Sequence, residues 1–174
     1  MAYELQTFCD DARASLKGKP LGAALEDIAA NLRKLLANEA FVKATFNDDT
    51  PVGKRELFHD KETDFYVLAH VQQAGKGGKP HSHGASWAVY GNATGVTEMT
   101  EWKRVNDAKE EAHVLQQSDK YELRPGQSRG YGPGVIHSTA HPHKAWVIRV
   151  TGTDLDHLPR YHFKRDRDRL LETA

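Results

Sequence analysis

The stretch GKGGKPHSHGASWAVYGNATG, residues 75–95, decides the interpretation of this sequence. It carries His81 and His83 two positions apart, followed by a β-prone run between glycine-containing turns. In a β-strand, residues i and i+2 point to the same face, so a strand here would direct two imidazoles to one point. An HxH pair by itself also occurs as a surface or structural pair, so its meaning depends on the rest of the chain.

A second stretch, PGQSRGYGPGVIHSTAH at residues 125–141, supplies a third imidazole. Its glycines and Pro133 predict sharp turns, followed by a strand that would carry His137 into the fold. We therefore predict one metal site with His81, His83 and His137 as the ligands. The alternative is a β-barrel whose histidines are core or surface groups.

The two stretches resemble the two motifs of the cupin superfamily, G-x5-H-x-H-x4-E-x6-G and G-x5-P-x-G-x2-H-x3-N. Three positions depart from the pattern: Ala88 occupies the glutamate slot, Gly132 the proline slot and His141 the asparagine slot. The resemblance implies a mainly β fold, the cupin double-stranded β-helix (jelly-roll barrel). It also implies a centre with three histidines and no carboxylate ligand.

Nitrogen ligation suits transition metals better than magnesium or calcium. Iron(II) with open positions can bind a substrate and dioxygen, whereas zinc more often activates water. We expect Fe(II), with Zn, Ni or Mn as ions that could accompany the purified protein. The ligand set alone leaves this choice open.

A three-histidine cupin resembles the thiol dioxygenases, namely cysteine dioxygenase and 3-mercaptopropionate dioxygenase. SHGASWAVYG, with Trp87, is similar to the mercaptopropionate branch, and KRELFHDKETDFYVLAHV at residues 54–71 resembles the strand pair that bears the family's substrate arginine. Arg55 stands at the matching spacing from Phe65. The resemblance implies that Arg55 clamps a substrate carboxylate, and the competing interpretation is a solvated charge at a strand end.

The family's later strand carries Ser, His and Tyr residues, but the matching stretch here is AWVIRVTG, residues 145–152. Arg149 falls near the family's histidine and is the rival anchor. Tyr131, Tyr161 or His162 are the candidates to replace the missing groups. This departure leaves the substrate open. The alternatives are a diketone-cleaving dioxygenase, an isomerase or hydrolase, and a non-catalytic small-ligand-binding cupin.

The composition limits the partners. The 174 residues include 24 basic and 24 acidic side chains, so no single-sign field favours nucleic acid or an anionic membrane. A single cysteine, Cys9, excludes an internal disulfide and suits a reducing, cytoplasmic compartment. We expect a small-molecule substrate and O2 as partners, no nucleic acid and no membrane, and we leave a homo-oligomer open.

The chain is expected to form one domain of two parts. Residues 1–46 are predicted to be helical, because apolar residues recur at steps of three and four. We expect this helical segment to pack on the barrel. Residues 47–174 read as the barrel, with many short strands. The polar tail from Asp154 is expected to form a loop or capping strand and then a short surface helix.

The remaining histidines are expected to be structural. His141 and His143 follow the second motif and suit surface or supporting roles, and His70 lies on a predicted strand out of phase with the ligands. Another four lie in polar segments: His59, His113, His157 and His162. The aromatic residues Trp87, Tyr90, Trp102 and Trp146 are expected to fill the barrel core.

Overall fold

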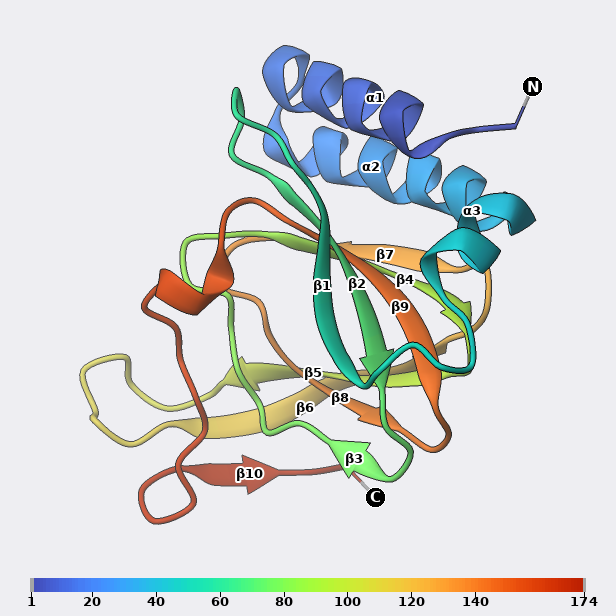
Figure 1. Cartoon of the computed structure of the whole chain (residues 1–174). Coiled ribbons are helices and arrows are strands. Elements are labelled where there is room, and N and C mark those ends of the chain that lie inside the picture. Colours follow the sequence, from blue (N-terminus) through green and yellow to red (C-terminus); the bar gives the residue numbers. More distant parts are fainter. Residues whose placement is uncertain (1, 174) are drawn as a thin grey trace.

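A computed structural model describes residues 2–173 of the chain. It begins with three helices, α1 (Leu5–Gly18), α2 (Leu21–Leu36) and α3 (Glu39–Thr45), and continues as short strands (Figure 1). Helix α2 has the predicted apolar stripe, and its side chains Ile28, Leu32 and Leu35 are fully buried. Helix α3 is preceded by the N-cap Asn38, whose side chain accepts a hydrogen bond from the Phe41 backbone N–H.

Ten strands follow the helices in the described chain, and they form two five-stranded sheets. The strands are β1 (Gly53–His59), β2 (Tyr66–Gln72), β3 (Lys76–Gly77), β4 (Ala88–Thr94), β5 (Thr97–Arg104), β6 (Val114–Leu123), β7 (Ser128–Tyr131), β8 (Ile136–His141), β9 (Ala145–Thr151) and β10 (Arg169–Leu171). One sheet has the order β1-β2-β9-β4-β7 and the other β10-β6-β5-β8-β3. All pairings are antiparallel except that of β10 with β6.

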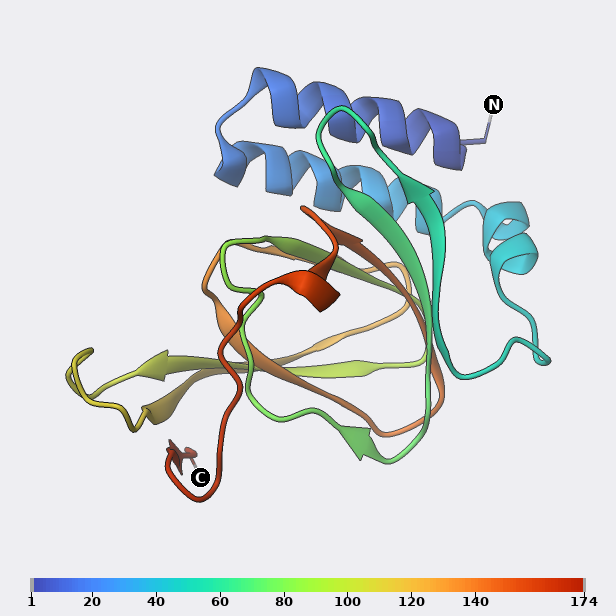
Figure 2. The ribbon, with the colours of Figure 1, turned by 60° about the vertical axis from the view of Figure 1, so that its left-hand side comes forward.

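The two sheets face each other and enclose an interior, and the helices lie outside the first sheet (Figure 2). Neighbours such as β9 and β4 are far apart in sequence, which is the crossover connectivity of a jelly roll. The predicted mainly β double-stranded β-helix with an N-terminal helical segment is thus confirmed.

The first sheet has two different faces because strand residues alternate. On β2, Val67, Ala69 and Val71 belong to the apolar core beneath the helices. His70 points to the other face, into the interior between the sheets. The same alternation on β9 puts Ile148 in the core beneath the helices and Arg149 inside. We call these the helix-facing side and the interior side.

The tail differs from the prediction of a surface helix. After a short 3-10 turn at Leu155–His157, the chain runs extended and ends in strand β10. Buried Asp168 accepts hydrogen bonds from the backbone N–H groups of His113 and Lys164 and from the Tyr161 hydroxyl. These bonds tie the charged run to β6, so tertiary contacts override the local helix preference. Among residues 2–173, no helix has the length and apolar character that crossing a membrane requires.

Candidate metal centre

His137 and His81 are joined through their backbones. His137 lies on β8, and each residue donates its N–H to the carbonyl of the other at 2.9 Å. This pair forms an isolated antiparallel bridge. The segment around His81 and His83 is therefore held against β8 without being the regular strand that the sequence analysis assumed.

His83 is positioned by a tight turn rather than by strand alternation. The next residue, Gly84, has a positive φ of 58°, and a Cβ on it would lie 2.1 Å from the Pro159 carbonyl oxygen. The Gly84 carbonyl accepts a hydrogen bond from the Gly134 N–H at 2.9 Å. Glycine is therefore required at position 84, and the two motif segments are fastened together directly beside His83.

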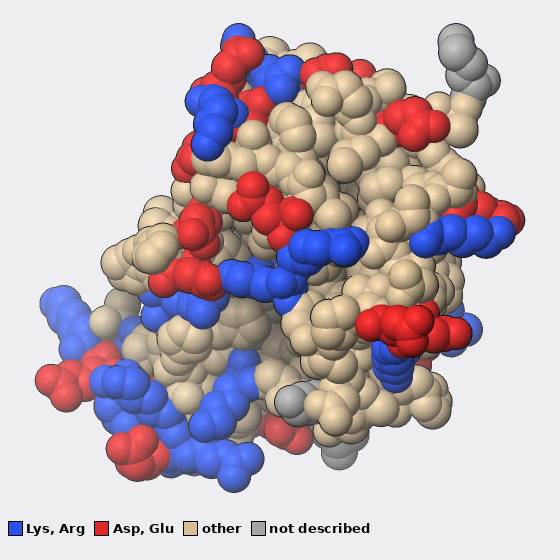
Figure 3. All heavy atoms as spheres, viewed as in Figure 1, with Lys and Arg blue, Asp and Glu red and all other residues tan. Residues whose placement is uncertain are grey.

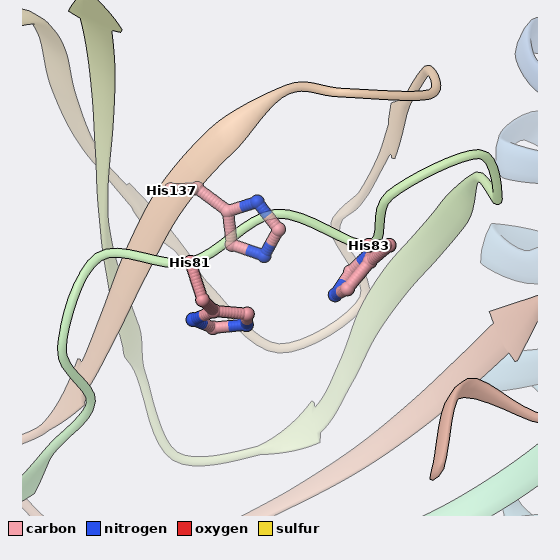
Figure 4. Close-up of side chains that lie close together, drawn as sticks. All are labelled: His81, His83 and His137. Carbon is pink, nitrogen blue, oxygen red and sulfur yellow. The ribbon is translucent and has the colours of Figure 1, made fainter. Parts of the chain in front are cut away.

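The three histidines converge in the interior (Figure 4). Their ligand atoms all lie within 4.8 Å of one another, and His83 and His137 are buried. Metal to imidazole bonds of about 2.1 Å bring ligand nitrogens to within about 4 Å of each other, so small ring rotations would complete a site. The cluster thus fits a metal ion with three nitrogen ligands.

The protonation states suit ligation. Burial, followed by the neighbouring histidines, lowers the pKa of His83 to about 2, and burial also lowers the pKa of His137 to about 3. The Nδ1 atom of His81 lies 3.0 Å from the Lys79 carbonyl oxygen, which can only accept, so Nδ1 carries the proton. The His81 Nε2 lone pair is then free for a metal.

Tyrosines support two of the imidazoles. The Tyr90 hydroxyl lies 3.3 Å from His83 Nε2, and the Tyr131 ring stacks on His137 with centroids 5.2 Å apart. The Tyr131 hydroxyl is 2.6 Å from that of Tyr121, which donates to Glu101 at 2.8 Å. Of the three sequence candidates for this role, the structure brings Tyr131 to the cluster. Tyr121 and Glu101 were missed, because only the pairing of β5 with β6 reveals them.

Tyr161 and His162 border the ligand segment. The Tyr161 hydroxyl donates to Asp168, whereas the exposed His162 accepts a hydrogen bond from Arg160 and its ring stacks beside that of His81 with centroids 6.2 Å apart. Backbone contacts join the same segments, because His162 forms a bridge with His81 and the Ser82 N–H donates to the Tyr161 carbonyl. The tail segment therefore borders the ligand segment, a contact with no signal in the sequence.

Arg55 is not brought to the histidines, which corrects the expectation that it enters their cavity. It pairs across the sheet with Ala69, on the helix-facing side, and its guanidinium donates to the Thr45 carbonyl at 2.6 Å. The spacing from Phe65 did not predict the direction of the Arg55 side chain. A bulge between Glu56 and Phe58 shifts the register of β1, and a shift of one residue turns a side chain to the other face of the sheet.

Arg149 is brought to the interior. It lies opposite Tyr90 on β4, and its positive charge contributes to lowering the pKa values of His81, His83 and His137. Its Nε atom is buried and has no hydrogen-bond partner in the described chain. Of the two predicted anchors, Arg149 is the one within electrostatic reach of the histidine cluster.

No protein-family model matches the sequence, and no curated protein is significantly similar to it. The solved structures that resemble the chain include KdgF from Halomonas sp. (15% identity, 65% of this chain and 91% of that chain, TM-score 0.46). A cupin superfamily protein from Desulfitobacterium hafniense DCB-2 is similar at 12% identity, covering 63% of this chain and 84% of that one, with a TM-score of 0.44. The DMSP lyase DddQ from Ruegeria pomeroyi DSS-3 shows 12% identity over 67% of this chain and 55% of that one, with a TM-score of 0.46. These TM-scores are all below 0.5, so the similarities assign no function to this chain.

Proposed function

We propose that this chain is a non-haem iron(II) dioxygenase that acts on a small thiol carboxylate such as cysteine or 3-mercaptopropionate. The observation that carries the proposal is the group His81, His83 and His137, which gathers three neutral imidazoles in the interior. Such a group would hold a divalent ion without neutralising its charge. Iron(II) held there would supply a site for an anionic substrate group and for activation of dioxygen.

The reaction balances without a further reductant. A thiol takes up both atoms of O2 to give a sulfinic acid, R–SH + O2 → R–SO2H, so the sulfur supplies all the electrons. The protein therefore needs to supply only the metal ligands, a substrate anchor and a sheltered cavity.

Within this proposal, Arg149 is the substrate anchor. A guanidinium binds a carboxylate through two parallel hydrogen bonds, and Arg149 has no hydrogen bond or ion pair in the described chain that would compete. Arg55 cannot take this role from the helix-facing side. Tyr90 and Tyr131 orient His83 and His137 through the contacts described above.

Metal analysis and oxygen uptake test the proposal. Protein purified without oxygen and loaded with iron(II) should consume O2 with cysteine or 3-mercaptopropionate and form the sulfinate in equal amount. Zinc-loaded protein is the matched control, because zinc has no redox chemistry and should give no uptake. Oxygen uptake with acetylacetone and not with thiols would replace the thiol substrate by a diketone. No uptake with any of the three would reject the dioxygenase.

A further inference from the structure

An open basin includes Arg149, which pairs across the sheet with Tyr90, the tyrosine beside His83, but none of the three clustered histidines lines it. It has a volume of about 420 Å³ and is lined in part by Lys54, His70, Arg149 and Arg160. Figure 3 shows Lys and Arg side chains on both sides of a hollow near the middle of the face viewed there. The volume falls within the usual range of small-molecule sites, about 300–1,000 Å³.

His70 is a buried polar group with an unused hydrogen-bonding atom. Its side chain projects from β2 to the interior side, the residue is 9% exposed, and its Nε2 atom has no partner in the described chain. A buried polar atom without a partner is unfavourable by about 1–3 kcal/mol. His70 was expected to be structural, but no hydrogen bond in the described chain uses this nitrogen.

Arg149 lies next to His70 in the same basin. Both residues also line a smaller inner cavity of about 20 Å³, so they stand where the open basin narrows. The buried Nε of Arg149 is likewise without a partner. Two buried nitrogens without partners lie at one constriction, and one of them belongs to a partly buried cation. An anion there would pair with the guanidinium and would favour the His70 tautomer that carries its proton on Nε2.

The rim of the basin does not supply that anion. The carboxylate of Asp156 is engaged by Lys54, and the Nε of Arg160 donates to His162 at 3.0 Å. With one acidic side chain against three basic ones along the lining, the basin keeps an excess of positive charge. A negatively charged ligand is therefore favoured at the constriction.

We propose that His70 and Arg149 together form a carboxylate-binding subsite, in which the His70 Nε2–H and the Arg149 guanidinium donate to the same small organic anion. The inference rests on the proposed function for the anchoring role of Arg149, and it adds His70 as a specificity-determining residue. Because Arg149 lies opposite Tyr90 on β4, and the Tyr90 hydroxyl is 3.3 Å from His83 Nε2, a ligand held by Arg149 lies on the side of the interior that holds the metal centre.

Binding of propionate to zinc-loaded protein tests the subsite without turnover. Calorimetry should show that His70→Met weakens binding about tenfold, whereas the near-isosteric His70→Gln, which keeps an N–H donor, stays within about threefold of the parent. Arg149→Met should weaken binding by more than His70→Met. Arg55→Met, an arginine of the same sheet on the helix-facing side, is the control and should bind as the parent does.

Zinc content and thermal melting accompany each measurement. If His70→Met does not fold, His70→Phe keeps a ring without the donor and takes its place. Equal propionate binding by the parent and by a folded variant without the donor would overturn the role of His70. Loss of propionate binding in these variants, together with an iron-loaded parent that consumes no O2, would keep the subsite and reject the dioxygenase.

Discussion

The two sides of the sheet β1-β2-β9-β4-β7 have opposite characters although they share the same strands. The helix-facing side is apolar and fully packed, with Val67, Val89 and Ile148 beneath the helices. The interior side has its own buried cluster, which includes Tyr90, Met99 and Val147, but it also carries His70 and Arg149, whose buried nitrogens lack partners. Residues available for a ligand therefore lie on the interior side, and a substitution of His70 or Arg149 should affect binding more than a substitution beneath the helices does.

The largest expected effect lies at the centre itself. His137→Ala should abolish stoichiometric metal binding, with a loss of affinity above the 10–100-fold typical of removing an outer-shell partner, because a direct ligand is lost. Elemental analysis after dialysis against one equivalent of zinc measures the zinc that each variant retains. The exposed His143→Ala is the matched control, and equal zinc retention by both variants would remove His137 from the ligand set.

On the helix-facing side, the expected effect is on folding. Leu32 is fully buried and its side chain packs against the backbone of Gly91 on β4. Leu32→Ala should lower the free energy of unfolding by about 2–5 kcal/mol, while folded protein still binds zinc. Leu171→Ala, at an exposed leucine, should change it by less than about 0.5 kcal/mol. Loss of zinc binding by folded Leu32→Ala protein would contradict the separation of the two sides.

Acid should destabilise the interior side first. Burial, and then the charge of Arg149, lowers the pKa of His70 to about 3 in the folded protein, against about 6.5 when unfolded. Below about pH 6.5 the unfolded chain takes up a proton that the folded chain does not. The free energy of unfolding therefore decreases as the pH is lowered. For this group the loss is about 2 kcal/mol between pH 7 and pH 5. Urea unfolding of metal-free protein should show it, with a smaller slope for His70→Gln.

Asp60, beside the helices, should respond at lower pH. Burial alone would raise its pKa, but hydrogen bonds from Arg13 and Thr63 outweigh this and lower it to about 2. Its stabilising contribution is therefore present above about pH 4 and is lost only as the pH falls towards 2. An Asp60→Asn variant whose stability profile differs from that of the parent mainly between pH 5 and pH 7 would contradict this assignment.

The smallest expected effect concerns the two arginines. Arg149→Met should leave the free energy of unfolding unchanged or raise it by up to about 1 kcal/mol, because an unpartnered, partly buried charge is replaced by an apolar side chain. Arg55→Met should lower it by about 1 kcal/mol through loss of the bond to Thr45. Thermal and urea unfolding of the two variants side by side decides this. A loss above about 2 kcal/mol for Arg149→Met would show that Arg149 is structural.

The sequence predicted the features that depend on local pattern. The apolar spacing of α2 identified the helical segment, and the short strands indicated a sandwich or a barrel. The resemblance to the two cupin motifs implied the jelly roll. The histidine spacing also identified three residues that lie together, although the reason differed: His81 and His83 are held by a backbone bridge and a glycine turn rather than by a regular strand.

Features that depend on pairing between distant strands could not be predicted. A single bulge in β1 changes the face of the sheet on which Arg55 lies, from the expected interior side to the helix-facing side. The interior direction of His70 follows from the register of β2 against β9, and the chain of Glu101, Tyr121 and Tyr131 from β5, β6 and β7 meeting in the interior. No local signal encodes these contacts.

The pairing of residues 161–163 with the ligand segment makes the metal centre depend on the far end of the chain. The Ser82 N–H donates to the Tyr161 carbonyl and the Phe163 N–H to the Pro80 carbonyl, while His81 bonds to His137 on its other edge. The ligand segment thus has hydrogen-bonded neighbours on both edges, as an inner strand does. A chain cut before residue 161 would leave one of these edges unpaired, although it would keep all three histidines.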